Sequence, residues 1–192
     1  MAKDEVYYDD RVFSEADVLE KGQRATFFNS CLFKKCDFSE VDFKNCNFTN
    51  CEFDGCNLSM VKFNEAGLDH ANFKNSKLLG TDFSVAKDFL FSVNFTACIL
   101  DYATFAKKKN KKAKFIDCSL KGADFTESDL TLVVFKQCNL SGAIFMRTIL
   151  VQANLTQAFN FSIDPAQNNV RKALFSPSGL SGLLHKYDIV VT

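Results

Sequence analysis

The sequence predicts a solenoid, a fold in which short repeats stack along one axis, and three observations support this prediction. A Phe or Leu residue recurs at every fifth position through most of the chain. The 192 residues include 22 Phe and 4 Tyr but no Trp, so one large apolar side chain without a hydrogen-bonding group is used many times. A period of five fits neither the helix period of about 3.6 residues nor the strand period of about 2. Repeats of fixed length are typical of stacked architectures.

The first run of the repeat contains twelve consecutive Phe or Leu residues. A small or compact residue lies two positions before each of them, and a polar residue, often Asp or Asn, lies between the two. The large residues are Phe28, Phe33, Phe38, Phe43, Phe48, Phe53, Leu58, Phe63, Leu68, Phe73, Leu78 and Phe83. The small residues are Thr26, Cys31, Cys36, Val41, Cys46, Cys51, Cys56, Val61, Ala66, Ala71, Ser76 and Thr81.

A second run follows after a slip of two residues in the repeat. Its large residues are Phe95, Leu100, Phe105, Phe115, Leu120, Phe125, Leu130, Phe135, Leu140, Phe145, Leu150 and Leu155. Small residues again precede them by two positions, from Val93 to Ala153. Upstream of the first run the repeat is imperfect, because Tyr8, Phe13 and Val18 are in phase but Gln23 is not. We therefore expect an irregular N-terminal cap over residues 1–25.

The pattern of a small residue, a polar residue, a Leu or Phe and two further residues resembles the pentapeptide-repeat family over about residues 26–158. The resemblance implies an all-β solenoid, the right-handed quadrilateral β-helix, with four pentapeptides per coil and with both the large and the small residue facing inward. Coils stacked about 4.8 Å apart would hydrogen-bond to each other along the axis. The structural core is then represented by Phe33, Phe53, Phe73, Phe95, Phe115 and Phe135.

All eight cysteines occupy the small inward position. A coil of twenty residues would place Cys31 beside Cys51, and Cys98 beside Cys118. A disulfide ladder and a metal site are the two alternatives to a structural role. We favour buried free thiols, because disulfides are rare in a reducing compartment and zinc needs thiolates that converge on one point. Free Cys packs well as a small buried side chain.

No arrangement in the sequence predicts catalysis. His70 falls at an outward position and His185 lies in the C-terminal tail, without a nucleophile and an orienting carboxylate at a recognisable spacing. The eight glycines are scattered and form no phosphate-binding loop. We expect a protein that is not an enzyme and that has no catalytic residue, metal or cofactor.

Two interruptions of the repeat are the expected sites of specificity, because variable segments on a rigid scaffold commonly carry function. In the first, near residues 84–94, the residues Phe89, Leu90 and Phe91 fall out of phase. One interpretation turns their rings into the core, and the other exposes them as an apolar contact. Phe89 and Phe91 are therefore candidate partner-binding residues.

The second interruption, near residues 106–112, is rich in lysine. Lys108 and Asn110 fall at inward positions, and because burying a polar group without a partner is costly we expect the chain to bulge outward here. The segment is a solvated charge run or the strongest positive feature of the surface. Its candidate partner-binding residues are Lys107, Lys108, Lys109, Lys111 and Lys112.

Overall charge excludes some classes of protein. The chain has 23 basic and 23 acidic side chains, whereas a general nucleic-acid binder needs an excess of Lys and Arg. Residues 1–10 are rich in charge, and no run of about 18 apolar residues occurs, so we expect neither a signal peptide nor a membrane span. We expect a cytoplasmic protein that contacts neither membranes nor nucleic acid directly.

The C-terminal residues 161–192 have a different composition and are expected to form a capping and dimerisation module on a β-helix that spans residues 1–160. Ser176 followed by Pro177 predicts the start of a short helix. Ile189–Val191 is strand-like. The tail resembles the C-terminal module of the quinolone-resistance (Qnr), MfpA-like and McbG-like proteins, which makes a two-fold dimer. The candidate interface residues are Leu180, Leu183, Leu184, Tyr187, Ile189 and Val191.

The same resemblance implies a function. Proteins of this group bind the type II topoisomerases DNA gyrase and topoisomerase IV and protect them from quinolones or peptide toxins, by mimicry of DNA in width and charge. We therefore expect gyrase or topoisomerase IV as partner, together with a homodimer. The alternative is a pentapeptide-repeat scaffold that binds another cytoplasmic protein, because a fold does not specify its function.

Overall fold

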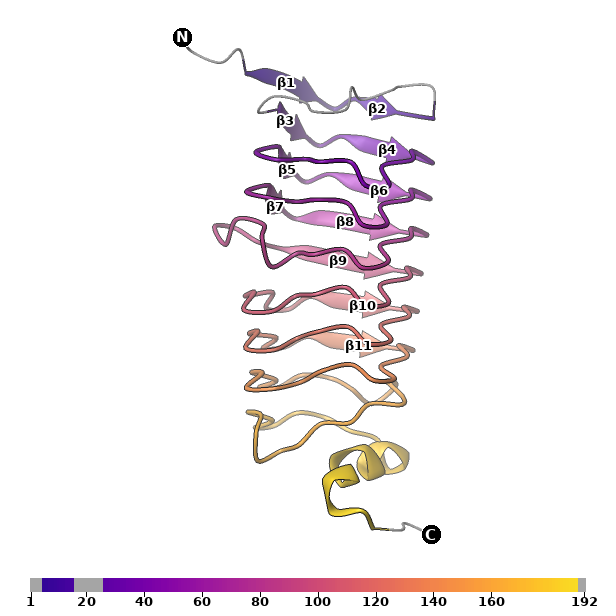
Figure 1. Cartoon of the computed structure of the whole chain (residues 1–192), viewed down its shortest axis with the longest axis vertical. Helices are drawn as coiled ribbons and strands as arrows, with labels where there is room; N and C mark the ends of the chain where they lie inside the picture. The colour runs from indigo at the N-terminus through magenta and orange to yellow at the C-terminus, as the bar shows by residue number, and fades with distance from the viewer. Residues whose placement is uncertain (1–4, 16–25, 190–192) are drawn as a thin grey trace.

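The computed structural model describes residues 5–15 and 26–189. The chain winds into a rod of stacked coils, with its N-terminus at one end and its C-terminus at the other (Figure 1). Strands of successive coils pair in parallel, so that Phe28 lies beside Phe48 and Phe33 beside Phe53. This parallel β-solenoid is the fold that the five-residue repeat predicts.

Two faces of the rod carry regular strands in the described part of the chain. The four-stranded sheet has the order β1 (Val6–Asp9), β3 (Thr26–Asn29), β5 (Asn47–Thr49) and β7 (Gly67–Asp69). The seven-stranded sheet runs from β11 (Val134–Lys136) through β10 (Lys114–Ile116), β9 (Val93–Thr96), β8 (Ala71–Lys74), β6 (Glu52–Asp54) and β4 (Leu32–Lys34) to β2 (Val12–Phe13). Elsewhere the coils are joined by single parallel bridges, such as Asp37 with Asn57.

A column of phenylalanine rings fills the interior behind the seven-stranded sheet. The six rings expose at most 1% of their surface, and neighbouring rings stack with their centroids 4.6 to 5.1 Å apart. Stacking follows directly from pairing in register, because strands one coil apart place identical positions side by side. These rings are Phe33, Phe53, Phe73, Phe95, Phe115 and Phe135.

The corners of the coils require a backbone conformation with positive φ. One residue at most corners adopts the left-handed conformation, for example Glu40 with φ of 59°, and its N–H donates to the next coil, here to Ser59 O at 3.0 Å. Polar residues and glycine fill most of these positions in the described residues. Four bulky apolar or aromatic residues do so as well, although such side chains are disfavoured at positive φ. They are Met60, Leu90, Tyr102 and Leu132.

Two short 3₁₀ helices, η1 (Pro177–Leu183) and η2 (His185–Tyr187), cover the C-terminal end of the rod. The Ser176 hydroxyl accepts a hydrogen bond from Gly179 N at 3.2 Å, so the expected helix start is correct, although the helix is 3₁₀ and short. Gly182 presses against the last coil, where a Cβ would lie 2.5 Å from Phe161 O.

The described residues at the N-terminal end pair with the next coil as regular coils do. The strands β1 and β2 pair in register with the coil below, Tyr8 beside Phe28 and Phe13 beside Phe33. The remainder of the expected cap, including Val18 and Gln23, lies outside the described residues, as do Val190 and Val191 of the expected C-terminal strand. Within the described ranges, none of the helices has the length and apolar character needed to cross a membrane.

Candidate functional site: an insertion and the coil beneath it

A two-residue insertion interrupts one coil of the rod. Phe73 pairs with Phe95, 22 positions along the chain, whereas Phe95 pairs with Phe115, 20 positions along. The additional residues form a loop between Ala86 and Val93 that projects from the side of the rod (Figure 1). The interruption that the sequence shows near residues 84–94 is therefore a local loop, and the coils on both sides of it keep their register.

The loop sends its apolar side chains in opposite directions. Phe91 is 6% exposed, and its ring packs edge-on against the Phe83 ring with the ring centroids 6.5 Å apart. The expectation that Phe91 binds a partner is therefore wrong. Its ring occupies core space that the insertion opens in the wall. Phe89 is 81% exposed and Leu90 is 56% exposed. Each of the two interpretations of this segment thus holds for a different ring.

The outward bulge expected at residues 106–112 does not occur. Lys108 and Asn110 are each 2% exposed, and Lys109 pairs with Asp129 of the next coil in the ordinary register. Lys108 is therefore wrong as a surface residue for partner binding. Both side chains are buried because the insertion in the coil above leaves polar groups facing them.

Lys108 binds the lower side of the loop. Its ammonium group donates to the Ala86 carbonyl and to an Asp88 carboxylate oxygen, the latter at 2.7 Å. The same nitrogen lies 5.3 Å from the centre of the Phe91 ring. A buried ammonium group is tolerated only when it is paired and hydrogen-bonded, and Lys108 meets both conditions.

The side-chain amide of Asn110 hydrogen-bonds to backbone groups that the insertion leaves without a backbone partner. Its side-chain oxygen accepts from Val93 N at 3.1 Å, and its side-chain nitrogen donates to Val93 O at 3.1 Å. Two coils further along the chain, the corresponding N–H of Val133 donates instead to the Leu130 carbonyl of its own coil. The amide of Asn110 therefore acts as a peptide group where the insertion has displaced one.

The sequence holds a signal for this arrangement that residue-by-residue reasoning missed. The polar inward residues Lys108 and Asn110 lie 22 positions after Ala86 and Asp88, where the repeat is interrupted. This separation corresponds to one coil with the two-residue insertion. Two irregularities at that separation are neighbours in a solenoid, so the second compensates the first. Treating each interruption separately led to the expectation of an outward bulge at residues 106–112.

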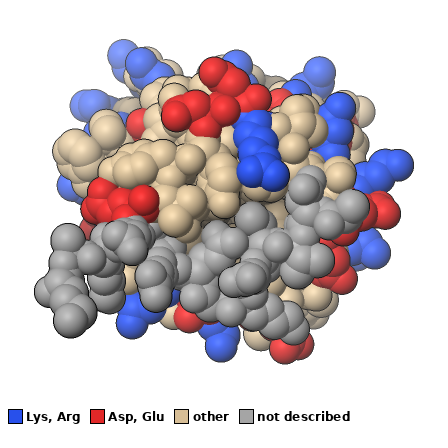
Figure 2. Space-filling model, turned by 90° about the horizontal axis from the view of Figure 1, so that it is seen from above, with Lys and Arg blue, Asp and Glu red and all other residues tan. Residues whose placement is uncertain are grey.

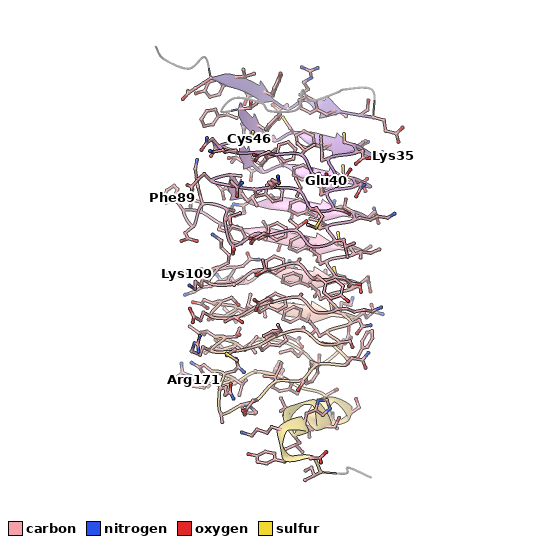
Figure 3. All side chains as sticks on the ribbon, viewed as in Figure 1. Lys35, Glu40, Cys46, Phe89, Lys109 and Arg171 are labelled. Carbon is pink, nitrogen blue, oxygen red and sulfur yellow. The ribbon has the colours of Figure 1, made fainter. Side chains whose placement is uncertain are left out.

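The remaining lysines of this coil reach the surface. Lys107, Lys109, Lys111 and Lys112 are exposed, and Lys111 lies 3.1 Å from an Asp129 carboxylate oxygen. Lys109 and Phe89 point outward from the same side of the rod (Figure 3). The surface therefore combines a projecting apolar loop with a row of ammonium groups one coil below it.

The described residues at the two ends of the rod form surfaces of different character. At the N-terminal end, acidic and basic side chains are interspersed (Figure 2). At the C-terminal end, a cavity of about 350 Å³ lies between the last coil and η1 and is lined by residues that include Phe161 and His185. Leu180, Tyr187 and Ile189 are 48%, 60% and 55% exposed. Two other candidate interface residues are partly buried: Leu183, which packs against the core, and Leu184.

The eight cysteines are buried free thiols, and burial raises the pKa of Cys51 and of Cys56 to about 12. Neutral thiols of this kind are poor nucleophiles and poor metal ligands. Over residues 5–15 and 26–189, no group of three or more His, Cys, Asp or Glu side chains is arranged to hold a metal ion. His70 lies outward, 2.6 Å from Asp69, and far from His185.

Family profiles match most of the rod. The profile of the pentapeptide repeat region matches residues 26–105, and the profile of pentapeptide repeats in eight copies matches residues 111–145 and 133–159. No curated protein matches the chain in a sequence search. The family matches stop short of the C-terminal helices.

The comparison with solved structures finds similar chains at low identity. Full-length QnrB1, a plasmid-mediated fluoroquinolone resistance protein, is 18% identical and superposes with a TM-score of 0.55, over 95% of this chain and 100% of that chain. HetL, a pentapeptide repeat protein involved in heterocyst differentiation regulation from the cyanobacterium Nostoc, is 19% identical, with a TM-score of 0.43 over 87% of this chain and 84% of that chain.

Proposed function

Because the chain belongs to the pentapeptide-repeat family, we propose that it is a cytoplasmic binding protein without catalytic activity whose partner is DNA gyrase or topoisomerase IV. In this proposal it protects the topoisomerase from quinolones or peptide toxins. The observation that carries the proposal is the exposed apolar loop at Phe89 on an otherwise regular rod, beside the exposed lysines of the next coil. The extent of the fold shared with the fluoroquinolone resistance protein QnrB1 supports the choice of partner.

The charge of the chain bears on how such a partner would be bound. DNA carries one negative charge per about 1.7 Å of helix axis, so a protein that copies it needs a strong excess of carboxylates. This chain has 23 acidic and 23 basic side chains. We therefore favour recognition through a local surface of the rod over mimicry of DNA along its length.

A second candidate function is a scaffold that binds another cytoplasmic protein. The same neutral charge favours it, because it removes the electrostatic reason for a DNA-binding enzyme to be the partner. Both candidates use the side of the rod for contact, and they differ only in the identity of the protein that is bound.

The experiment that separates them is a supercoiling assay with purified full-length protein, DNA gyrase and a fluoroquinolone. We expect the protein to restore supercoiling at drug concentrations that inhibit gyrase alone, in a dose-dependent manner. Parallel assays with topoisomerase IV would use decatenation as the readout. Absence of both protection and measurable binding to either topoisomerase would contradict the first proposal and leave the scaffold.

We also propose a homodimer formed through the C-terminal module. Leu180 and Tyr187 are exposed apolar side chains on the two short helices, and an isologous contact would cover them in both copies. Leu180→Asp should convert a dimer to a monomer in light scattering at micromolar concentration. Leu174→Asp, at another exposed apolar position on the last coil, serves as the control. A monomeric unmodified protein would contradict the proposal.

A further inference from the structure

Two of the four bulky residues with positive φ lie at one corner of the rod. Leu90 has φ of 58° and Leu132 has φ of 63°, and the corner residue of the coil between them is Lys112. Leu90 is 56% exposed and Leu132 is 39% exposed. Each leucine is thus disfavoured by its backbone conformation, and each keeps a substantial part of its surface in contact with water. Such outliers are more common at functional surfaces than elsewhere.

Phe89 extends this corner, because it directly precedes Leu90 and is 81% exposed. We call Phe89, Leu90 and Leu132 the apolar ridge. Single exposed apolar residues are ordinary in soluble proteins, but Phe89 and Leu90 are consecutive on one projecting loop, and Leu132 lies two coils further along, beyond the coil of Lys112.

The loop that carries Phe89 and Leu90 is anchored by the coil below it. Lys108 binds Ala86 and Asp88, Asn110 binds both backbone groups of Val93, and the Phe91 ring is buried in the core. These contacts anchor both ends of the insertion, so Phe89 and Leu90 are presented by a loop with little freedom. A preorganised contact surface loses less conformational entropy when a partner binds.

Basic side chains border the apolar ridge on the coil below the loop. Lys109, Lys111 and Lys112 are exposed on the coil below the loop, while the Asp88 carboxylate is already engaged by Lys108. We propose that the apolar ridge is a contact surface for a protein with an apolar pocket bordered by carboxylates. This inference rests on the proposed function for the identity of the partner, and it adds the place and chemistry of the contact. Opposite charges at the rim would steer association while the apolar side chains supply the buried centre.

A protein pocket fits the apolar ridge better than an anionic lipid surface. Stable attachment to a membrane needs an extended apolar face or two independent anchoring signals. The apolar ridge has three side chains, and one of the adjacent lysines, Lys111, is engaged by Asp129. A single projecting ring such as Phe89 matches a pocket of its own size.

The test uses substitutions that suit the backbone. In the ridge variant, Phe89→Ser, Leu90→Asn and Leu132→Asn remove the apolar side chains, and Asn is favoured at positive φ. The matched control is Met60→Asn with Tyr102→Asn, the same exchange at a different corner, where both residues have positive φ and are more than half exposed. Both variants should retain the melting temperature of the unmodified protein.

Two measurements then decide the proposal. Binding to DNA gyrase should weaken about tenfold or more in the ridge variant and remain unchanged in the control. The anionic apolar dye 8-anilinonaphthalene-1-sulfonate, which needs no biological partner, should gain fluorescence with the unmodified protein, and the ridge variant should lose most of that gain. Added salt should weaken both interactions, because the lysines are exposed.

The outcomes separate the two proposals. If unmodified protein does not bind gyrase, the proposed function fails, and the dye alone decides whether the apolar ridge is a site for anionic apolar groups. If the unmodified protein does bind gyrase and the ridge variant binds it with the same affinity, the apolar ridge is overturned as a contact surface. The same holds if the ridge variant gives the same gain in dye fluorescence as the unmodified protein. Binding to phosphatidylserine vesicles that the ridge variant loses, with gyrase binding unaffected, would overturn the protein pocket in favour of a lipid surface.

Discussion

Two neighbouring coils place very different side chains at the same inward positions. One coil has Lys108 and Asn110 there, and the next has Ser128 and Leu130, and all four are buried. The Ser128 hydroxyl donates to the Phe125 carbonyl of its own coil, and Leu130 packs in the core. Lys108 and Asn110 instead bind backbone groups of the coil above. The residue type at an inward position is therefore selected by the groups that face it from the adjoining coil.

The largest expected effect lies in the regular part of the rod. Phe125 is fully buried and stacks between Phe105 and Phe145 with centroid distances of 5.3 and 5.2 Å. Phe125→Ala should lower the free energy of unfolding by about 3–5 kcal/mol, because it leaves a cavity in a column that cannot collapse. Denaturant melts measure the change. A loss below about 1 kcal/mol would show that the column repacks.

The next effect tests the comparison between the coils directly. Asn110→Leu restores the residue type of the repeat but leaves Val93 N and O without the side-chain amide that binds them. We expect it to destabilise the protein by roughly 2–4 kcal/mol, because each unsatisfied buried group costs about 1–3 kcal/mol. The reciprocal change Leu130→Asn should also destabilise, since no insertion faces that position. A higher free energy of unfolding for Asn110→Leu in chemical denaturation would show that the hydrogen bonds of Asn110 to Val93 do not stabilise the insertion.

A smaller effect is expected at Lys108. Lys108→Met keeps most of the buried stem and removes the ammonium group that binds the Ala86 carbonyl. The loss should be about 1–3 kcal/mol, and limited proteolysis within the loop should become faster. Lys109→Met, at the adjacent exposed position, is the control and should change stability by less than about 0.5 kcal/mol. Equal proteolysis of the two variants would contradict the anchoring role of Lys108.

The smallest effect on stability is expected at the exposed lysines. Replacing Lys107, Lys109, Lys111 and Lys112 with Ser should change the unfolding free energy by less than about 0.5 kcal/mol per residue. Association with the topoisomerase should become slower, and more so at low salt, because exposed charges act mainly on the association rate and are screened beyond about 8 Å at physiological ionic strength. Stopped-flow binding at two salt concentrations measures this. Unchanged association rates would make these lysines a solvated surface.

Much of the fold follows from single positions of the sequence. The large and small residues of each pentapeptide face the same surroundings in every coil, so their spacing alone predicts which residues, such as Phe33 and Cys51, are buried. The cap at Ser176 also follows from local chemistry, since its hydroxyl binds an N–H three residues away. The loop and the lysine segment could not be resolved in this way, because their partners lie in adjoining coils.

The sequence by itself determined the solenoid, the register of its regular coils and the inward position of every cysteine, because a strict five-residue period makes one local environment repeat. The tertiary structure alone decided that Phe89 is exposed while Phe91 is buried, and that Lys108 and Asn110 enter the wall of the rod. The physical reason is hydrogen bonding between coils. A polar residue that would be costly in a regular coil becomes favourable beneath an insertion, where displaced backbone groups of the coil above need a partner.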